Sequence, residues 1–560
     1  MLKRFVATAA LAAGLMGSAQ DARACGGFFC SRSPVDQSSE RILFVTGPTT
    51  TTMVVQVAYA GGDADFSWVL PLGAVPQAGS LEVFPQMALN SLDANTGPQF
   101  NFPDDCWRFW PQAGSVEDGS TNGGGGGGGV NVHIREEVGP YDVAVVESAD
   151  PAALTAWLRT NGYRITSPME PYIRTYTDEG MKFLALKLLP GATVNQIEPL
   201  KLTLPGTVPS VPIRLSAIAA MPEMGMTVMV LGNQRYQPAN WPLVTINDNE
   251  IAFDPSNPWG ANGTNWSSLV ARKIDEAGGQ GFVTEYAGST AEFLQMITAS
   301  PVNTDEQQRA KDALLGVMQD NPYMTRLYAR LSPEEMRSDP IFRRSELGDV
   351  SRVHDLSRYV DGVDLCSDQT MMPPGNPCDF AACGAGGTCA VDAAGNAGCA
   401  CLDLATARPM TSPEGRPTVS CQDTRMSFVN PGDVDEATGT RLGDPCQTVG
   451  CGDHGRCVAV NLTPTCQCDR GFIAVNNNDG MRCQAPVQPI PETFYLRQMP
   501  DPAHPGRDLG GPPSRNPSMV GCACAVPFAG TPWATAGLMV GLFAVARRRR
   551  QGARGMEQAG

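Results

Sequence analysis

The sequence predicts an α+β head domain with mixed or antiparallel sheets and helices, followed by two small disulfide-rich modules and a C-terminal transmembrane segment. Three observations lead to this prediction. Strand-like and helix-like segments alternate over residues 25–360, twelve of the 18 cysteines form two groups of six, and residues 525–546 contain no charge. The chain has 560 residues, well above the ~100–200 residues of one domain, so several domains are expected.

The first 24 residues are typical of a secretory signal peptide. Lys3 and Arg4 form a charged start, residues 5–17 are apolar, and residues 22–24 form a small–x–small cleavage site. Cleavage there would make Cys25 the first residue of the exported chain. Lipidation of Cys25 is an alternative, but Arg23, two positions before it, fits an acylation signal poorly.

The head shows strand and helix signals between turn residues. Runs rich in β-branched and aromatic residues predict strands over 41–45, 52–60, 66–72, 130–134, 141–146, 181–189, 213–219 and 226–231. Asp150 followed by Pro151 predicts a helix start, and Gly162 predicts its end. Helices are also expected over 266–276, 289–297 and 304–345, the last because of two capping-box patterns that begin at Thr304 and Ser332.

The two cysteine groups repeat one spacing. They consist of Cys378, Cys383, Cys389, Cys399, Cys401 and Cys421, and of Cys446, Cys451, Cys457, Cys466, Cys468 and Cys483. Each group spans only about 40 residues, which is too few to bury an adequate core without cross-links. In an exported chain disulfides are the natural cross-links, although six cysteines by themselves allow 15 pairings.

The repeated spacing, with Cys468-Asp469-Arg470-Gly471-Phe472 in the second copy, resembles an epidermal-growth-factor-like (EGF-like) module. The resemblance predicts modules at 378–421 and 446–483, between linkers 361–377 and 422–445. It implies the pairs Cys378–Cys389, Cys383–Cys399, Cys401–Cys421, Cys446–Cys457, Cys451–Cys466 and Cys468–Cys483. The first copy departs from the family pattern because it lacks the Gly-aromatic turn. Zinc at the cysteines beside His454 and calcium at residues 433–436 are both disfavoured, so no metal or cofactor is expected.

The C-terminal part predicts an anchor. Residues 484–520 are rich in proline and predict an extended stalk. Residues 525–546 are long enough to cross a bilayer, and the four arginines at 547–550 would keep the tail 551–560 in the cytoplasm. Cys522 and Cys524, the apolar segment and the arginines together resemble a myxobacterial C-terminal sorting signal over 521–550. That resemblance implies processing near Cys522 and retention at the cell surface.

Catalytic patterns are scarce in the head. Its two histidines, His133 and His354, are too few for a metal site or a triad, and the seven glycines at 123–129 lack the Lys and helix of a phosphate-binding loop. Four further cysteines, Cys25, Cys30, Cys106 and Cys366, are expected in disulfides. A redox role for Cys25 and Cys30 is the alternative.

Several short motifs of the head resemble an uncharacterised exported bacterial family, a domain of unknown function. They are Cys-Gly-Gly-Phe-Phe-Cys at 25–30, Phe-Ser-Trp-Val-Leu-Pro at 66–71, and the segments 138–141, 179–183 and 279–283. The likeness spans about 25–345. It implies export and a shared fold, but it assigns no activity and no catalytic residue.

These patterns favour an exported, surface-anchored binding or structural protein. Its partners would be a surface protein or glycan, the membrane through 525–546, and the sorting machinery. A net charge of −16 argues against nucleic acid, since phosphate binding needs clustered Lys and Arg. A surface hydrolase with its site in the head and a thiol-redox protein are the alternatives.

Overall fold

The computed structural model of the chain describes residues 37–56, 67–101, 131–193, 196–252, 263–356, 376–434, 440–477 and 480–499, apart from residues 164 and 166. All of these residues belong to one compact unit, Met1–Leu509. The predicted signal peptide, the sorting signal and the segment 525–546 lie outside the described residues. Within the described part, none of the helices is both long and apolar enough to cross a membrane.

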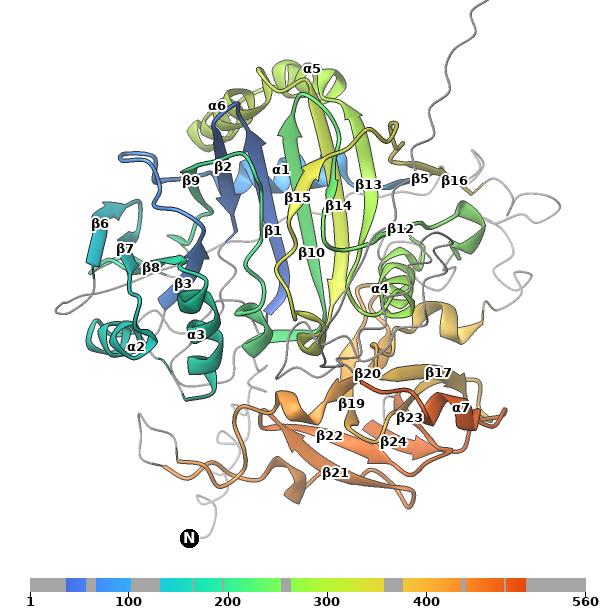
Figure 1. Ribbon diagram of the computed structural model, residues 1–560. Helices are drawn as coiled ribbons and strands as arrows, with labels where there is room; N and C mark the ends of the chain where they lie inside the picture. The colour runs from blue at the N-terminus through green and yellow to red at the C-terminus, as the bar shows by residue number, and fades with distance from the viewer. Residues whose placement is uncertain are drawn as a thin grey trace, which may run out of the picture. The chain divides into compact units, whose positions relative to one another are not determined.

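The head is built around an eight-stranded mixed sheet (Figure 1). Its strands, in spatial order, are β12 (Leu243–Val244), β13 (Phe282–Ser289), β14 (Tyr323–Leu331), β10 (Ala220–Gly232), β1 (Gln37–Thr46), β2 (Thr50–Val55), β9 (Leu200–Pro205) and β4 (Glu82–Val83). The pairs β1–β10 and β12–β13 are parallel, and the other neighbours are antiparallel.

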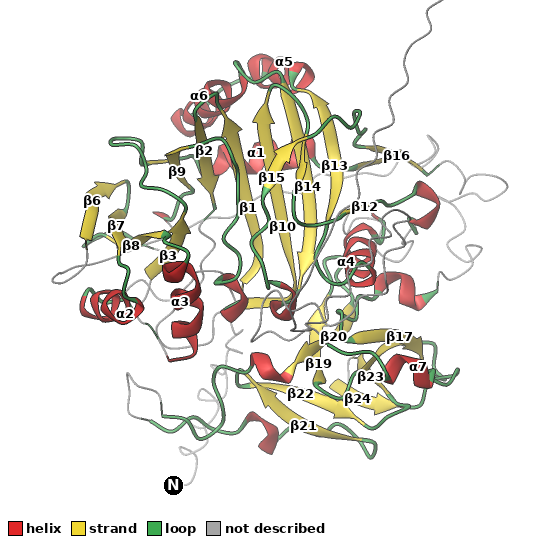
Figure 2. Cartoon of the chain, viewed as in Figure 1, coloured by secondary structure: helices red, strands yellow, loops and turns green. Residues whose placement is uncertain are grey.

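Both faces of this sheet are buried, because successive strand residues point to opposite faces. Leu43 belongs to a core cluster that includes residues of α1 (Gln86–Thr96), α5 (Ala291–Ala299) and α6 (Asp305–Met318). Its neighbours Ile42 and Phe44 belong to a second cluster that includes α4 (Trp266–Glu276). Figure 2 shows the helices in red against the yellow strands.

A second, antiparallel sheet completes the head. Its order is β3 (Ser67–Leu72), β8 (Lys182–Leu188), β7 (Tyr141–Glu147) and β6 (Asn131–Val138), and it is accompanied by α2 (Pro151–Thr160) and α3 (Glu170–Asp178). The helix start expected at Asp150 is confirmed, because the Asp150 carboxylate accepts the Ala152 N–H at 2.9 Å. Two short pairs, β11 (Tyr236–Pro238) with β15 (Phe342–Arg344) and β5 (Gln99–Asn101) with β16 (Val353–Asp355), lie beside the main sheet.

Two expectations for the head were wrong. The predicted strand 213–219 contains instead the one-turn 3-10 helix η5 (Ser216–Ile218), held by the bond from the Ser216 N–H to the Ile213 carbonyl. The predicted helix 304–345 ends with α6, and residues 323–331 form the central strand β14. The capping box at Ser332 exists, but it caps only the one-turn 3-10 helix η8 (Pro333–Glu335).

The Cys-rich region, residues 376–499, forms two four-stranded antiparallel sheets. One contains β17 (Gly387–Val391), β18 (Ala397–Cys401), β23 (Ile473–Asn477) and β24 (Gly480–Gln484), and the other contains β20 (Pro417–Asp423), β19 (Ala405–Thr411), β22 (Thr463–Cys468) and β21 (Gly455–Val460). Each sheet joins a hairpin from the first cysteine group to one from the second, at Cys399–Ala474 and Ala407–Cys466.

Six disulfides cross-link this region. The pairs are Cys378–Cys389, Cys383–Cys399, Cys401–Cys421, Cys446–Cys457, Cys451–Cys466 and Cys468–Cys483, the same pairs that the EGF-like resemblance implied. The two cysteine groups share one apolar core, with Cys421 and Cys466 both fully buried in it. The two cysteine groups therefore pack together through shared sheets and one core.

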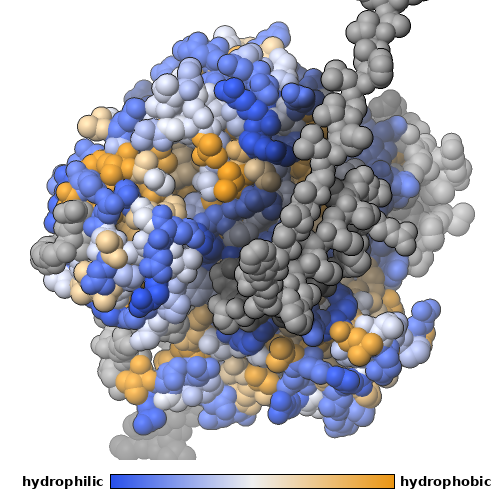
Figure 3. Space-filling model, viewed as in Figure 1, coloured by the Kyte–Doolittle hydropathy of each residue, from blue (hydrophilic) through white to orange (hydrophobic). Residues whose placement is uncertain are grey.

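The start of the predicted stalk also differs from expectation. Residues 484–499 pack on the Cys-rich core, where the short helix α7 (Glu492–Tyr495) buries Phe494, and Met499 is buried beside it. These two large apolar side chains explain why this proline-rich segment is not extended here. On the face shown in Figure 3, hydrophobic residues form small groups among hydrophilic ones.

Candidate functional site

The Cys-rich region contacts the head through hydrogen bonds that are buried or partly buried. Glu414 accepts the backbone N–H of Ser268 on α4 at 3.0 Å and the Ser268 hydroxyl at 2.9 Å. The Arg272 guanidinium donates to the Cys378 carbonyl at 2.6 Å, and the Asn265 amide donates to the Asp379 carbonyl at 2.9 Å. Because hydrogen bonds to charged groups in dry surroundings are strong, these contacts fix the orientation of the two parts.

Apolar contacts reinforce this boundary. Met426 of the Cys-rich region is 2% exposed and belongs to the core cluster of the head. Next to it, Phe428 contacts Tyr172 of α3 edge to face, with 6.2 Å between the ring centroids. The boundary therefore continues the hydrophobic core of the head.

Four carboxyl groups converge at the boundary, and we call them the boundary carboxyls: Glu223 on β10, Asp275 on α4, and Glu334 and Glu335 on η8. The three glutamates are at most 4% exposed, and Asp275 turns a buried carboxyl oxygen inward. Glu223 reaches the Cys-rich region, since a Cβ added to Gly384 would lie 3.7 Å from Glu223 Oε1 and 3.1 Å from Ser420 Oγ.

Few hydrogen bonds satisfy these carboxyls. Glu335 Oε2 accepts the Ser332 N–H at 2.7 Å as part of the capping box. Neither carboxyl oxygen of Glu223 or Glu334 has a hydrogen bond of normal geometry. An ionised carboxylate without such partners is costly to bury, so the arrangement favours the neutral, protonated form.

The pKa values follow from this environment. Burial raises the pKa of Glu223, and it raises the pKa values of Asp275 and Glu334 well above their usual range. Burial and the nearby Glu223 raise the pKa of Glu335 to about 8. The interaction between Asp275 and Glu335 raises the pKa of Asp275 and lowers that of Glu335.

Glu223 occupies a strained backbone position. It is one of three non-glycine residues with positive φ in the described chain, at 59°. It lies in a bulge of β10, where the pairing with β1 shifts from Gln37–Ala220 to Ser39–Gly225. Left-handed backbone at a non-glycine residue costs on the order of 1–3 kcal/mol and is characteristic of functional positions.

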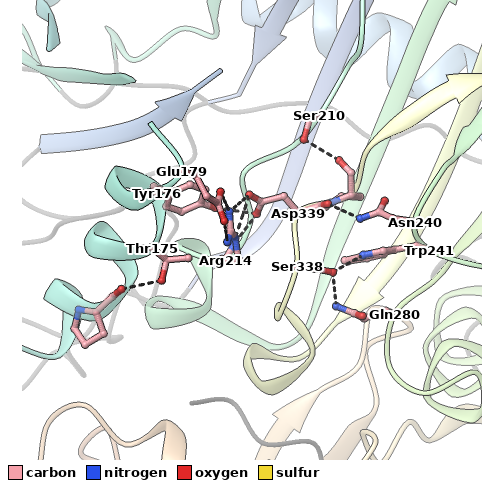
Figure 4. A network of polar contacts seen from close by, with 12 residues as sticks. Thr175, Tyr176, Glu179, Ser210, Arg214, Asn240, Trp241, Gln280, Ser338 and Asp339 are labelled. Atoms are coloured by element: carbon pink, nitrogen blue, oxygen red, sulfur yellow. Dashed lines mark hydrogen bonds and ion pairs between the residues drawn. The ribbon is translucent and has the colours of Figure 1, made fainter. Parts of the chain in front are cut away.

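A second polar network lies on the loop that follows η8 (Figure 4). Arg214 donates to both carboxylate oxygens of Glu179, at 2.7 and 2.6 Å, and to Asp339 at 2.8 Å, and Asp339 also accepts the Tyr176 hydroxyl at 2.8 Å. Ser338 accepts hydrogen bonds from Trp241 and Gln280, and Gln280 also donates to the Glu335 carbonyl. This network ties α3 to the loop that follows η8, the one-turn helix that carries Glu334 and Glu335.

His354 forms an acid–histidine pair that the sequence did not reveal. Its Nδ1 lies 2.8 Å from an Asp248 carboxylate oxygen, and its ring is stacked on Phe100 and packed against Trp266. The buried Nε2 has no hydrogen-bond partner, so the pair lacks a nucleophile in contact with it. The residues are 106 positions apart, so no local motif could have shown the pair. The other head histidine, His133, pairs with Glu147 at 2.9 Å on the surface.

The remaining candidates for a functional site are a metal centre, a surface hollow and the other cysteines. In the described part of the chain, no three His, Cys, Asp or Glu side chains are arranged to hold a metal ion. A hollow of about 540 Å³ is lined by Gly139, Pro140, Leu189, Pro190, Gly191, Ala192, Gln196 and Glu198. Cys25, Cys30, Cys106, Cys366, Cys522 and Cys524 lie outside the described residues.

The fold and boundary define a mixed α+β protein whose C-terminal part is a small disulfide-rich region. The family model described as "Uncharacterized protein conserved in bacteria (DUF2330)" matches residues 19–343, more than half of the chain, and the chain belongs to this family. The likeness expected over about 25–345 is therefore confirmed. The match ends before the Cys-rich region. No curated protein and no solved structure matches the chain.

Proposed function

We propose that the chain is an exported, surface-anchored binding or structural protein in which the head and the Cys-rich region act as one rigid body. The observation that carries this proposal is the buried bond pair between Ser268 and Glu414, together with the six disulfides. Disulfides persist in oxidising compartments outside the cytoplasm, which supports export by a signal peptide at 1–24.

The anchor in this proposal is the C-terminal segment. Residues 521–550 would act as the sorting signal, with 525–546 crossing the membrane and Cys522 or Cys524 at the processing site. The cysteine pairing supports an EGF-like origin of the two cysteine groups. The partner would be a protein or glycan of the cell surface.

Surface display can be tested in a bacterium that makes the full chain, a chain ending at residue 520, or Cys522→Ser and Cys524→Ser variants. The full chain should be cleaved by protease added to intact cells, and the truncated chain should appear in the medium. A chain that stays protected inside intact cells would overturn the proposal. Binding is then tested with purified residues 25–520 on isolated cell envelopes, where saturable retention is expected.

A surface hydrolase is the second candidate, because the Asp248 carboxylate can orient His354 for proton transfer; since no side chain in the described part of the chain is hydrogen-bonded to Nε2, the nucleophile would have to be water. Turnover of ester, peptide or glycan substrates that His354→Gln abolishes, while the variant keeps the wild-type melting temperature, would favour this candidate over a binding protein.

A further inference from the structure

The boundary between the head and the Cys-rich region buries more acids than bases. Two buried arginines lie near the boundary carboxyls: Arg330 on β14, 8% exposed, acts on Glu223, and Arg408 on β19, 4% exposed, donates to the Met221 sulfur of β10 at 3.1 Å. Arg330 donates to the Tyr328 hydroxyl at 3.4 Å, and its Nε has no partner. If all four carboxyls were ionised, the site would hold an excess of buried negative charge, which is strongly unfavourable.

The other charged groups around the cluster do not remove this excess. Arg337, which follows η8, lowers the pKa of Glu335, and its guanidinium donates to the Gly278 carbonyl. On the Cys-rich side, Asp423 and Glu414 add further acids, and Asp423 already pairs with Arg425 at 2.6 Å. Against the six acids named here, Arg330, Arg337, Arg408 and Arg425 leave an excess of negative charge, which protons on the carboxyls would balance.

We propose that the boundary carboxyls form a proton-operated latch, which holds the Cys-rich region against the head while they are protonated and releases it when they ionise. The inference goes beyond the proposed function, because it limits the rigid-body arrangement to the pH range in which the boundary carboxyls are protonated. Ionised Glu223 beside Gly384 and Ser420 could regain water only if β20 moved away from the head.

The change of the opening equilibrium constant with pH follows from proton linkage. Glu335 has a pKa of about 8 in the closed state against 4.5 when exposed to water. This one group would raise the opening equilibrium constant about 50-fold between pH 6 and pH 8. The linked carboxyls act in the same direction, so 50-fold is the contribution of Glu335 alone.

Oxidation of buried methionines by hydrogen peroxide measures this opening in the full chain. Met426 belongs to the Cys-rich region and is buried in the core of the head, whereas Met318, the last residue of α6, is buried in the other core cluster. Their oxidation rates at pH 6 and pH 8 are read by mass spectrometry. We expect the Met426 rate to rise at least about 50-fold from pH 6 to pH 8, and the Met318 rate to stay nearly constant.

Two variants test whether ionisation of Glu335 causes the rise of the Met426 oxidation rate with pH. Glu335→Gln keeps an oxygen for the Ser332 N–H but cannot ionise, so the rise at Met426 should shrink to a few-fold. Glu292→Gln, at a side chain 69% exposed on α5, should behave as wild type. A pH-independent Met426 rate, an undiminished rise in Glu335→Gln, or a parallel rise at Met318 would each overturn the proposal. If the variant fails to fold, the comparison of Met426 with Met318 in the wild-type chain still decides.

Discussion

Ser268 and Glu414 lie 146 positions apart, yet the Glu414 carboxylate accepts both the backbone N–H and the hydroxyl of Ser268. Glu414 is 1% exposed and Ser268 is 2% exposed. A buried carboxylate bound in this way connects the disulfide-rich region to the first turn of α4. The head and the Cys-rich region are consequently joined by a buried, hydrogen-bonded boundary and not only by the chain that connects them.

Removing this connection should destabilise the protein. Glu414→Ala leaves the buried N–H and hydroxyl of Ser268 without their acceptor, which should lower the free energy of unfolding by about 2–3 kcal/mol. Chemical denaturation measures the change. The matched control is Glu292→Ala on the exposed face of α5, where the change should stay within about 0.5 kcal/mol. Equal effects of the two substitutions would contradict the importance of the Ser268 contact.

The stability provided by the Arg214 network should depend on the shape of the guanidinium group as well as on its charge. Arg214→Lys keeps the charge but cannot bond Glu179 and Asp339 together, and Asp339 is buried, so a loss of about 2–4 kcal/mol is expected. Arg159→Lys is the control, because the Arg159–Glu170 pair is 45% exposed on both sides and should matter by less than about 1 kcal/mol. Thermal unfolding of both variants checks this order, and a larger loss in the control would refute it.

The shared core of the Cys-rich region predicts coupling between the cysteine groups. Replacing Cys401 and Cys421 together by serine should cost about 2–5 kcal/mol. Because β19 pairs with β22, amide exchange should also accelerate in β22, which belongs to the second group. Hydrogen exchange resolves this effect. If β22 kept its wild-type protection, the two groups would be independent modules after all.

The boundary carboxyls predict that stability decreases with rising pH. Their pKa values are higher in the folded chain than in the unfolded chain, so the folded chain binds more protons. Their stabilising contribution is complete below a pH of about 4.5 and is lost as the pH rises through about 8 for Glu335. The melting temperature should therefore be lower at pH 8 than at pH 6. A higher value at pH 8 would show that these groups are ionised in the folded state.

Local signals in the sequence predicted much of the head. The helix 266–276 matches α4 residue for residue, because its boundaries depend on Trp266 and on the two glycines that follow. The error at 323–331 has a physical cause: the Ser332 capping box is real, but burial of both faces of β14 imposes a strand before it. Tertiary packing, rather than the local sequence, makes residues 323–331 a strand.

The candidate site could not be predicted from the sequence. The disulfide pairs followed from a resemblance, whereas the sharing of sheets between the two cysteine groups depends on long-range strand pairing. Glu223, Asp275 and Glu334 come from three elements far apart in the chain, and no spacing marks them. Only burial and the missing hydrogen bonds distinguish these acids from the many that lie on the surface.

The central claim, that the head and the Cys-rich region form one rigid body, is tested most directly by a distance distribution. Spin labels carried by unnatural amino acids would replace Glu276 at the end of α4 and Leu496 after α7, both well exposed. Electron–electron double resonance at pH 6 should give a single narrow distance peak. A broad or multiple distribution in the folded chain would contradict the claim.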